Sequence, residues 1–204
     1  MLVKRIPAGV YAANCYIIVD EISKECAVID PGGDSDELIE FINSLNATVK
    51  FILLTHGHMD HIGAVGQLKE TYNIDAHIHK ADGDFIENGE FMFGPLKYKG
   101  ASVSLEKDIV EGKQFYIGDL CIECMETPGH SPGGICFKVQ DKIFTGDTLF
   151  LRSIGRTDLS GGSFETLIDS IKNKLLVLDD NIEVFPGHGP ATTIKYERGH
   201  NPFI

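Results

Sequence analysis

The stretch Thr55-His56-Gly57-His58-Met59-Asp60-His61 decides the fold, because it places four possible metal ligands within six positions of a predicted loop. An apolar run over residues 49–54 precedes it, and its β-branched and large apolar side chains predict a buried strand. The residues that follow, from about 62 to 72, have the pattern of a helix. The histidine-rich stretch therefore joins a strand to a helix, where a rigid scaffold can present side chains for binding.

The chemistry of this stretch favours a metal site over a purely structural role. A single histidine on a loop is usually a surface residue, but three histidines and an aspartate so close together are not explained that way. Crowded imidazoles repel one another once they are protonated, unless a cation uses their lone pairs. His56 and His58 are two residues apart, so in an extended segment their side chains point the same way.

Composition narrows the classes of function. The 204 residues are 43% hydrophobic and 24% charged, which is ordinary for a globular protein, and no linker or shift in composition divides them. We therefore expect one domain over residues 1–204. The formal charge of −12 argues against nucleic acid or an anionic membrane as the partner.

The compartment expected from the sequence is the cytoplasm. No apolar run approaches the roughly 20 residues that span a bilayer, and residues 1–7 lack the apolar core of a signal peptide. The five cysteines are an odd number, which argues against a disulfide framework. Cys121 and Cys124 form a CxxC on a predicted strand, where they face opposite sides, so we expect reduced thiols rather than a redox or zinc site.

Strands and helices alternate twice along the chain, which predicts an α/β protein built as an αββα sandwich of two sheets with helices outside. Residues 80–107 are the least regular part and suggest a loop or short helices over the site. Strands are expected at residues 14–20, 25–30, 49–54, 76–79, 113–117, 120–126, 135–139, 142–145 and 182–185, and helices at about 35–45, 62–72, 164–176 and 193–199.

Three more ligand-type side chains follow later strands. His130, Asp147 and His188 each come after an apolar strand and a small segment that contains glycine or proline, so we expect the strand ends to converge on one edge. The resulting set is too large for one catalytic ion, which usually takes about three protein ligands, but suits two ions that share a carboxylate. Nitrogen-rich ligation favours zinc over calcium or magnesium, with iron and manganese also possible. The full set is His56, His58, Asp60, His61, His130, Asp147 and His188.

The motif at residues 55–61, together with the three later residues, resembles the HxHxDH signature of the metallo-β-lactamase superfamily and its downstream partners. The resemblance covers nearly the whole chain and implies the αββα sandwich with metals at the sheet edge. It also implies His56, His58 and His130 on one ion, with Asp147 between the two ions. The ligands that it implies on the other ion are Asp60, His61 and His188.

Within that superfamily, the sequence is most similar to the type II glyoxalases, the hydroxyacylglutathione hydrolases, in their short bacterial form. Residues 146–150 (GDTLF), 186–190 (PGHGP) and 197–203 (ERGHNPF) carry this resemblance. Zinc β-lactamases typically have another residue where Asp147 stands, which disfavours lactam hydrolysis. The segment Gly155-Arg156-Thr157-Asp158 also resembles persulfide dioxygenases, which use one iron and the first ligand set.

The resemblance implies a two-metal thioester hydrolase acting on S-acylglutathione or a similar small-molecule thioester. In this hypothesis the ions turn a bridging water into hydroxide near neutral pH, and the hydroxide attacks the thioester carbonyl. Asp60 both ligates and orients the nucleophile. Arg156 is the candidate for gripping a substrate carboxylate, with a structural salt bridge to Asp158 as the alternative. The rival functions are the one-iron dioxygenase and a non-catalytic module that only binds metal.

Overall fold

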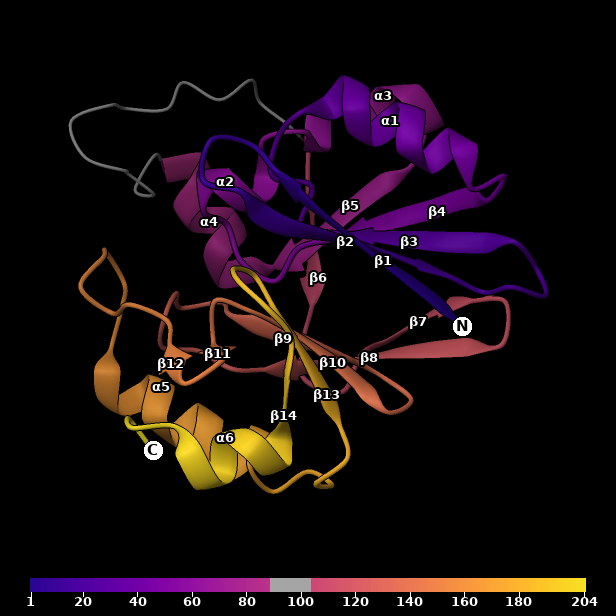
Figure 1. Cartoon of the computed structure of the whole chain (residues 1–204). Helices are drawn as coiled ribbons and strands as arrows, with labels where there is room; N and C mark the ends of the chain where they lie inside the picture. The colour runs from indigo at the N-terminus through magenta and orange to yellow at the C-terminus, as the bar shows by residue number, and fades with distance from the viewer. Residues whose placement is uncertain (89–103) are drawn as a thin grey trace.

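A computed structural model describes residues 1–88 and 104–204, and over these residues the chain forms two sheets packed face to face with helices on both outer sides (Figure 1). The predicted αββα sandwich is confirmed. Residues 89–103, which include most of the segment expected to lie over the site, are outside the described part.

The first sheet is built from the N-terminal half of the chain. Its first three strands are antiparallel neighbours, and the later strands pair in parallel through helical crossovers. Its strands lie in chain order: β1 (Leu2–Ala8), β2 (Ala13–Val19), β3 (Glu25–Ile29), β4 (Thr48–Leu53), β5 (Asp75–His79) and β6 (Glu106–Ile109).

The second sheet comes from the C-terminal half and is mostly antiparallel, with one parallel pair, β10 and β13. A separate two-stranded hairpin, β11 (Leu149–Phe150) and β12 (Ser153–Ile154), follows β10. The order across the second sheet is β14 (Thr192–Thr193), β13 (Glu183–Pro186), β10 (Lys142–Gly146), β9 (Ile135–Val139), β8 (Leu120–Glu126) and β7 (Gln114–Ile117).

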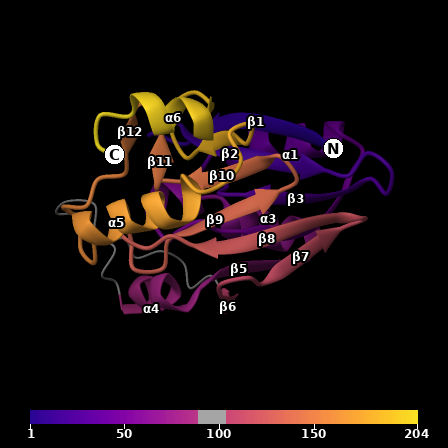
Figure 2. The same ribbon diagram turned by 90° about the horizontal axis from the view of Figure 1, so that it is seen from below.

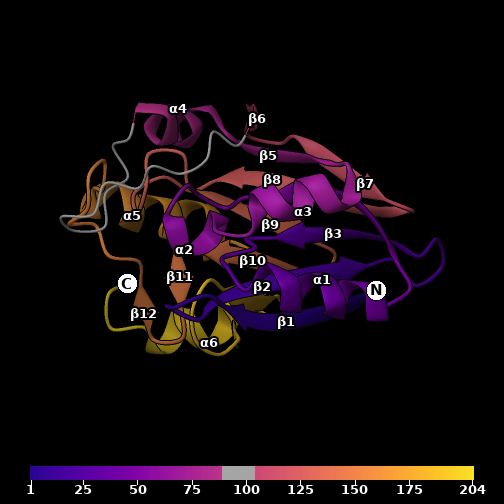
Figure 3. The same cartoon turned by 90° about the horizontal axis from the view of Figure 1, so that it is seen from above.

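Helices form the outer layers. Helices α1 (Ser35–Ser44) and α3 (Val65–Tyr72) lie over the first sheet (Figure 3). Helices α5 (Phe164–Ser170) and α6 (Ile194–His200) cover the second (Figure 2), and α5 continues into a π-helical turn over Ile171–Leu175. Nowhere in the described ranges is a helix long and apolar enough to cross a membrane.

Three apolar clusters match the three interfaces between the four layers. Cys15, Ile17 and Val28 pack toward α1 and α3, while their strand neighbours Tyr16 and Ile18 face the other sheet. This alternation follows from the period of two along a strand. It makes β2 buried on both faces.

Several local predictions need correction. The helix expected at about 62–72 is two helices, because the N–H of Ala64 bonds to the carbonyl of Pro31 and interrupts the turn between α2 (Met59–Ile62) and α3. Helix α1 begins at Ser35, as expected, and the Ser35 hydroxyl donates to the Gln67 side chain on α3. Strand β1 was not expected as an element, whereas α4 (Lys80–Asn88) is a short helix in the segment for which a loop or short helices were expected.

Candidate metal centre

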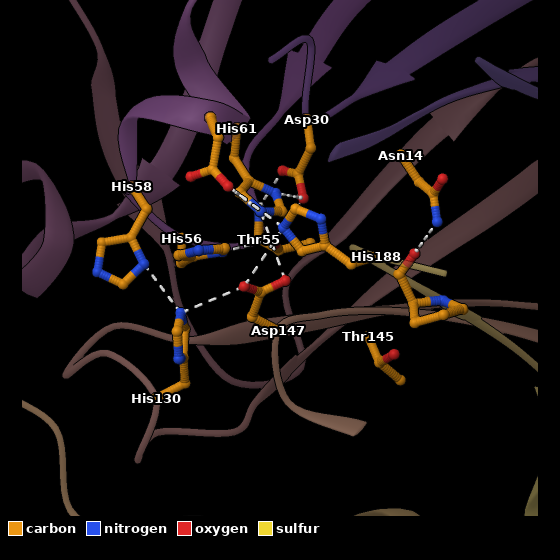
Figure 4. Close-up of polar contacts among 12 residues, drawn as sticks. Asn14, Asp30, Thr55, His56, His58, His61, His130, Thr145, Asp147 and His188 are labelled. Carbon is orange, nitrogen blue, oxygen red and sulfur yellow. Dashed lines mark hydrogen bonds and ion pairs between the residues drawn. The ribbon is translucent and has the colours of Figure 1, made fainter. Parts of the chain in front are cut away.

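Four strand ends bring the predicted ligands together at one edge of the sandwich (Figure 4). The chain leaves β4 into His56 and His58 and then turns into the short helix α2, which carries the aspartate and the last histidine of the motif. His130 follows β8, and the loops after β10 and β13 carry the remaining two ligands. The structure therefore places all seven predicted residues around one small volume contributed by both sheets: His56, His58, Asp60, His61, His130, Asp147 and His188.

The first cluster is formed by His56, His58 and His130, all buried. One nitrogen from each lies within 4.8 Å of the others, and His130 Nε2 is 2.8 Å from His58 Nδ1. Three imidazoles this close suit a shared cation, because neutral imidazole nitrogens offer lone pairs to a metal.

The second cluster is formed by Asp60, His61 and His188, which can also present atoms within 4.8 Å of one another. His188 Nε2 lies 3.2 Å from Asp60 Oδ2, and His61 is completely buried. The grouping matches the assignment implied by the family resemblance.

Asp147 lies between the two clusters. Its Oδ1 is 3.4 Å from His61 Nε2, and its Oδ2 is 3.6 Å from His130 Nε2. A carboxylate with one oxygen toward each cluster has the arrangement of a bridging ligand. The loop that carries His188 can approach Asp147 closely because Gly187 has no side chain. A Cβ at that position would lie only 2.3 Å from Asp147 Oδ1.

The buried aspartate Asp30, just after β3, fixes the ring nitrogens of two of these histidines. Its Oδ2 accepts from the Thr55 hydroxyl (2.6 Å) and from His61 Nδ1 (2.9 Å). Since the Thr55 hydroxyl donates to Asp30, its oxygen accepts from His56 Nδ1, 3.0 Å away. Each imidazole therefore carries its proton on Nδ1 and directs the Nε2 lone pair into the site.

His130 is oriented by the main chain of Arg156, whose carbonyl accepts from His130 Nδ1 at 2.7 Å. The Arg156 side chain instead forms a two-bond pair with Asp158, with both donor–acceptor distances 2.7 Å, and it is exposed. The structure thus shows the salt-bridge arrangement that was the alternative for Arg156. Its contact with a substrate carboxylate stays a prediction.

Orphaned polar atoms test whether these residues fit metal ions. Four buried ligand atoms have no hydrogen-bond partner: His56 Nε2, Asp60 Oδ1, His61 Nε2 and Asp147 Oδ1. Buried polar atoms without partners are rare and costly, so four in one place indicate a missing partner. All four belong to side chains that donate lone pairs, and the donor set of imidazoles and carboxylates is that of zinc, iron or manganese.

The electrostatics of the site shift the pKa values of its histidines in opposite directions. Burial, together with the neighbouring imidazoles, lowers the pKa of His58 to about 3 and lowers that of His56 well below its ordinary value. Burial alone would raise the pKa of Asp147, but His61 and His130 outweigh it and lower that pKa. By contrast, Asp147 and Asp30 outweigh burial and raise the pKa of His61 well above its ordinary value, and the contact with Asp60 raises that of His188. His56 and His58 are therefore in the neutral form that binds a metal, whereas His61 and His188 would give up a proton when a metal binds.

Asn14, on β2, supports the His188 loop and was not foreseen from the sequence. Its side-chain amide donates to the carbonyls of Pro186 and Gly189, each at 2.9 Å, and its backbone N–H donates to Gly187. Asp30 was also missed, although it follows an apolar strand as the ligands do. By contrast, Cys121 and Cys124 are free thiols and join no potential metal group in residues 1–88 and 104–204.

Comparison with known proteins identifies the relatives of this chain. The family model described as "Metallo-beta-lactamase superfamily" matches residues 8–188. A protein named hydroxyacylglutathione hydrolase GloC, from Haemophilus influenzae, is 39% identical over 100% of this chain and 98% of its own length. The probable metallo-hydrolase YqgX of Bacillus subtilis is 36% identical over 98% of this chain and 96% of its own length.

Solved structures give the same fold. The B3 metallo-beta-lactamase BLEG-1 is 37% identical with a TM-score of 0.83, covering 99% of both chains. TTHA1623 in a di-iron-bound form is 31% identical with a TM-score of 0.88, covering 98% of this chain and 100% of its own. ETHE1 from Myxococcus xanthus is 29% identical with a TM-score of 0.83, covering 99% of this chain and 84% of its own.

Proposed function

The chain belongs to the metallo-beta-lactamase superfamily, and from that premise we propose that it hydrolyses a small-molecule thioester in the manner of a type II glyoxalase, using two divalent metal ions. The coarser statement, a metal-dependent hydrolase of this superfamily, rests on the family match. The similarity to GloC supports S-acylglutathione, or a related thioester, as the substrate class.

The observation that carries the two-ion proposal is the completeness of both ligand clusters around one shared carboxylate. Asp147 has one oxygen near His61 and the other near His130. An enzyme with a single ion would need only one of these clusters. We assign zinc to both positions from the imidazole-rich donor set, with iron as the competing metal because a similar structure holds two iron ions.

The side chains of the chain have distinct tasks in this reaction. When bound, the two ions would supply an activated water and an electrophile for the thioester carbonyl. Asp60 combines an unpartnered Oδ1 with an Oδ2 that lies against His188, so it can orient the attacking water while it ligates. A thiolate is a good leaving group, so the site needs no strong general acid.

The direct test is metal analysis combined with an assay of S-lactoylglutathione hydrolysis on the purified protein. We expect about two zinc ions per chain and an activity that a chelator abolishes and added zinc restores. The matched variant is Asp60→Asn, for which we expect a loss of turnover of at least about a hundredfold. Thioester hydrolysis that resists the chelator, or a protein that binds no metal, would contradict the proposal.

Three alternatives are measured in the same experiment. A persulfide dioxygenase, which the ETHE1 neighbour also fits, would hold one iron and consume oxygen with glutathione persulfide. Because of the similarity to BLEG-1, hydrolysis of a β-lactam is also assayed. Asp147 disfavours this activity, since zinc β-lactamases typically have another residue at its position. A non-catalytic metal-binding module would bind the ions and turn over none of the three substrates.

A further inference from the structure

Asp82 is a buried carboxylate that does not belong to either ligand cluster. It lies in the first turn of α4, and none of its surface is exposed. Its Oδ2 accepts from the backbone N–H of Gly57 at 2.9 Å, and its Oδ1 accepts from that of Gly133 at 2.5 Å. A buried carboxylate is costly unless hydrogen bonds satisfy it, so both of these contacts are needed for Asp82 to stay where it is.

The two glycines belong to loops from different sheets. Gly57 lies between His56 and His58, in the loop that follows β4 of the first sheet. Gly133 lies three residues after His130, in the loop between β8 and β9 of the second sheet. Asp82 therefore connects the two loops that carry all three ligands of the first cluster.

The contact on the Gly133 side is tight. A Cβ at that position would lie 2.7 Å from Asp82 Oδ1 and 2.8 Å from the Asp82 backbone nitrogen. Only glycine lets the His130 loop come this close, so any larger residue must push the loop away from α4.

We propose that Asp82 is a positioning residue for one of the two metal ions: it holds the loops of His56, His58 and His130 at the separation at which their imidazoles share a cation. This rests on the proposed function, because it needs the metal centre. The second cluster is held by other contacts, since Asp60 and His61 lie on α2 and the His188 loop is held by Asn14. The change at Asp82 should therefore act on one ion and spare the other.

Stepwise zinc affinity, measured by competition with a chromophoric chelator on the full chain, tests this inference. Asp82→Ala removes both acceptors, Asp82→Asn keeps one, and Gly133→Ala disturbs the same contact from the opposite loop. The control is Asp84→Asn on the same helix, whose carboxylate pairs with Lys80 and Lys107 near the surface. The melting temperature of each metal-free variant separates loss of fold from loss of affinity.

In Asp82→Ala we expect one zinc to bind about 10- to 100-fold more weakly, the range for loss of a group that orients metal ligands, with a smaller loss in Asp82→Asn. Gly133→Ala should weaken the same ion, and Asp84→Asn should bind both as wild type does. To identify the ion, His188→Ala added to Asp82→Ala should remove the remaining tight site. His130→Ala added to Asp82→Ala should weaken the already weakened site further and leave the tight site unchanged.

Two results would overturn the inference. One is wild-type affinity for both ions in Asp82→Ala and Gly133→Ala. The other is an equal weakening of both ions that follows the melting temperature, which would make Asp82 a general structural residue. If Asp82→Ala does not fold, Asp82→Asn and Gly133→Ala give the answer. A wild-type protein that binds no zinc would instead defeat the proposed function, so the two failures are distinguishable.

Discussion

At the scale of single residues, side chains outside the two ligand clusters orient the candidate ligands. Asp30 accepts from Thr55 and from His61, and through Thr55 it also fixes the tautomer of His56. One carboxylate thereby sets the Nε2 lone pairs of a histidine in each cluster. Removing such contacts behind metal ligands typically weakens metal binding.

Replacing Asp30 by asparagine should weaken both ions. An amide nitrogen in place of Oδ2 removes the acceptor of both the Thr55 hydroxyl and His61 Nδ1, so the His61 tautomer is no longer fixed. In place of Oδ1 it removes the acceptor of the Thr55 backbone N–H. We expect affinity for zinc to fall about 10- to 100-fold in Asp30→Asn, measured by chelator competition. Asp75→Asn, an exposed aspartate at the start of β5, is the control and should leave both affinities unchanged.

A second residue-scale prediction concerns Arg156. If its guanidinium leaves Asp158 to bind a substrate carboxylate, Arg156→Ala raises KM about tenfold or more and leaves kcat almost unchanged, because uniform binding is lost. Asp158→Ala frees the guanidinium and should not raise KM. Steady-state kinetics with S-lactoylglutathione checks both variants, and equal effects in the two would assign the pair a structural role only.

The residues that were predicted from the sequence differ physically from those that were missed. The ligands were recognised because imidazoles and carboxylates after buried strands are unusual on their own. Asn14 and Asp82 form hydrogen bonds with backbone groups that lie more than 50 residues away in the sequence, on other elements. No local sequence pattern reveals such a partner. Only the folded structure shows which main-chain groups a buried polar side chain can reach.

At the scale of elements, the buried strands were predictable and the edge was not. β2 is buried along its whole length and β3 is buried beyond its first residue, and the two pair antiparallel where strands were expected. β1 contains Lys4, Arg5 and Pro7 and is only partly buried, because it is an edge strand with one unpaired side. An edge strand tolerates proline and charged residues, so the sequence of β1 does not show the regular apolar alternation that identifies a strand.

The C-terminal helix α6 supports the segment that follows the shared carboxylate. Glu197 is fully buried, and its Oε2 accepts from the backbone N–H of Arg152 (2.8 Å) and from the Asn201 amide (2.9 Å). Its Oε1 accepts from the Thr192 hydroxyl at 2.6 Å. These contacts fasten α6 to the β11–β12 hairpin, which starts two residues after Asp147.

Truncating Glu197 should destabilise this corner of the molecule. Glu197→Ala leaves the part-buried N–H of Arg152 and the buried hydroxyl of Thr192 without acceptors, and we expect a loss of about 2–4 kcal/mol in the free energy of unfolding. Urea denaturation of the metal-free protein measures it, with Lys195→Ala on the exposed side of the same helix as the control. A loss of less than about 0.5 kcal/mol in Glu197→Ala would show that water or a local shift satisfies these groups.

At the scale of the whole molecule, the layers were predictable because the apolar pattern alone determines them. Strands with apolar side chains on both faces need cover on both sides, which requires a sandwich with outer helices. Which strand ends meet was not determined by that pattern. The site depends on how the two sheets stack, and this in turn depends on inter-sheet contacts such as Tyr16 with Phe144, whose ring centroids are 5.1 Å apart.

Bound metal ions should cross-link the N-terminal and C-terminal halves of the chain. The first sheet supplies His56, His58, Asp60 and His61, and the second supplies the other three ligands. Ions that bind only the folded chain stabilise it by about 2.7 kcal/mol each at a hundredfold excess over the dissociation constant. For a chain of this size, each kilocalorie corresponds to about 2–4 °C, so one ion contributes about 5–10 °C.

We therefore expect a chelator to lower the melting temperature of the zinc-loaded protein by about 5–10 °C or more, and added zinc to restore it. The variant Phe144→Leu distinguishes the stabilisation by metal ions from that by apolar packing, because it reduces the packing between the sheets without changing a ligand. That variant should melt at a lower temperature by a similar amount with and without chelator, as expected for additive, independent contributions. If the chelator leaves the wild-type melting temperature unchanged, the two halves are held by the apolar layer alone and the ions have no part in stability.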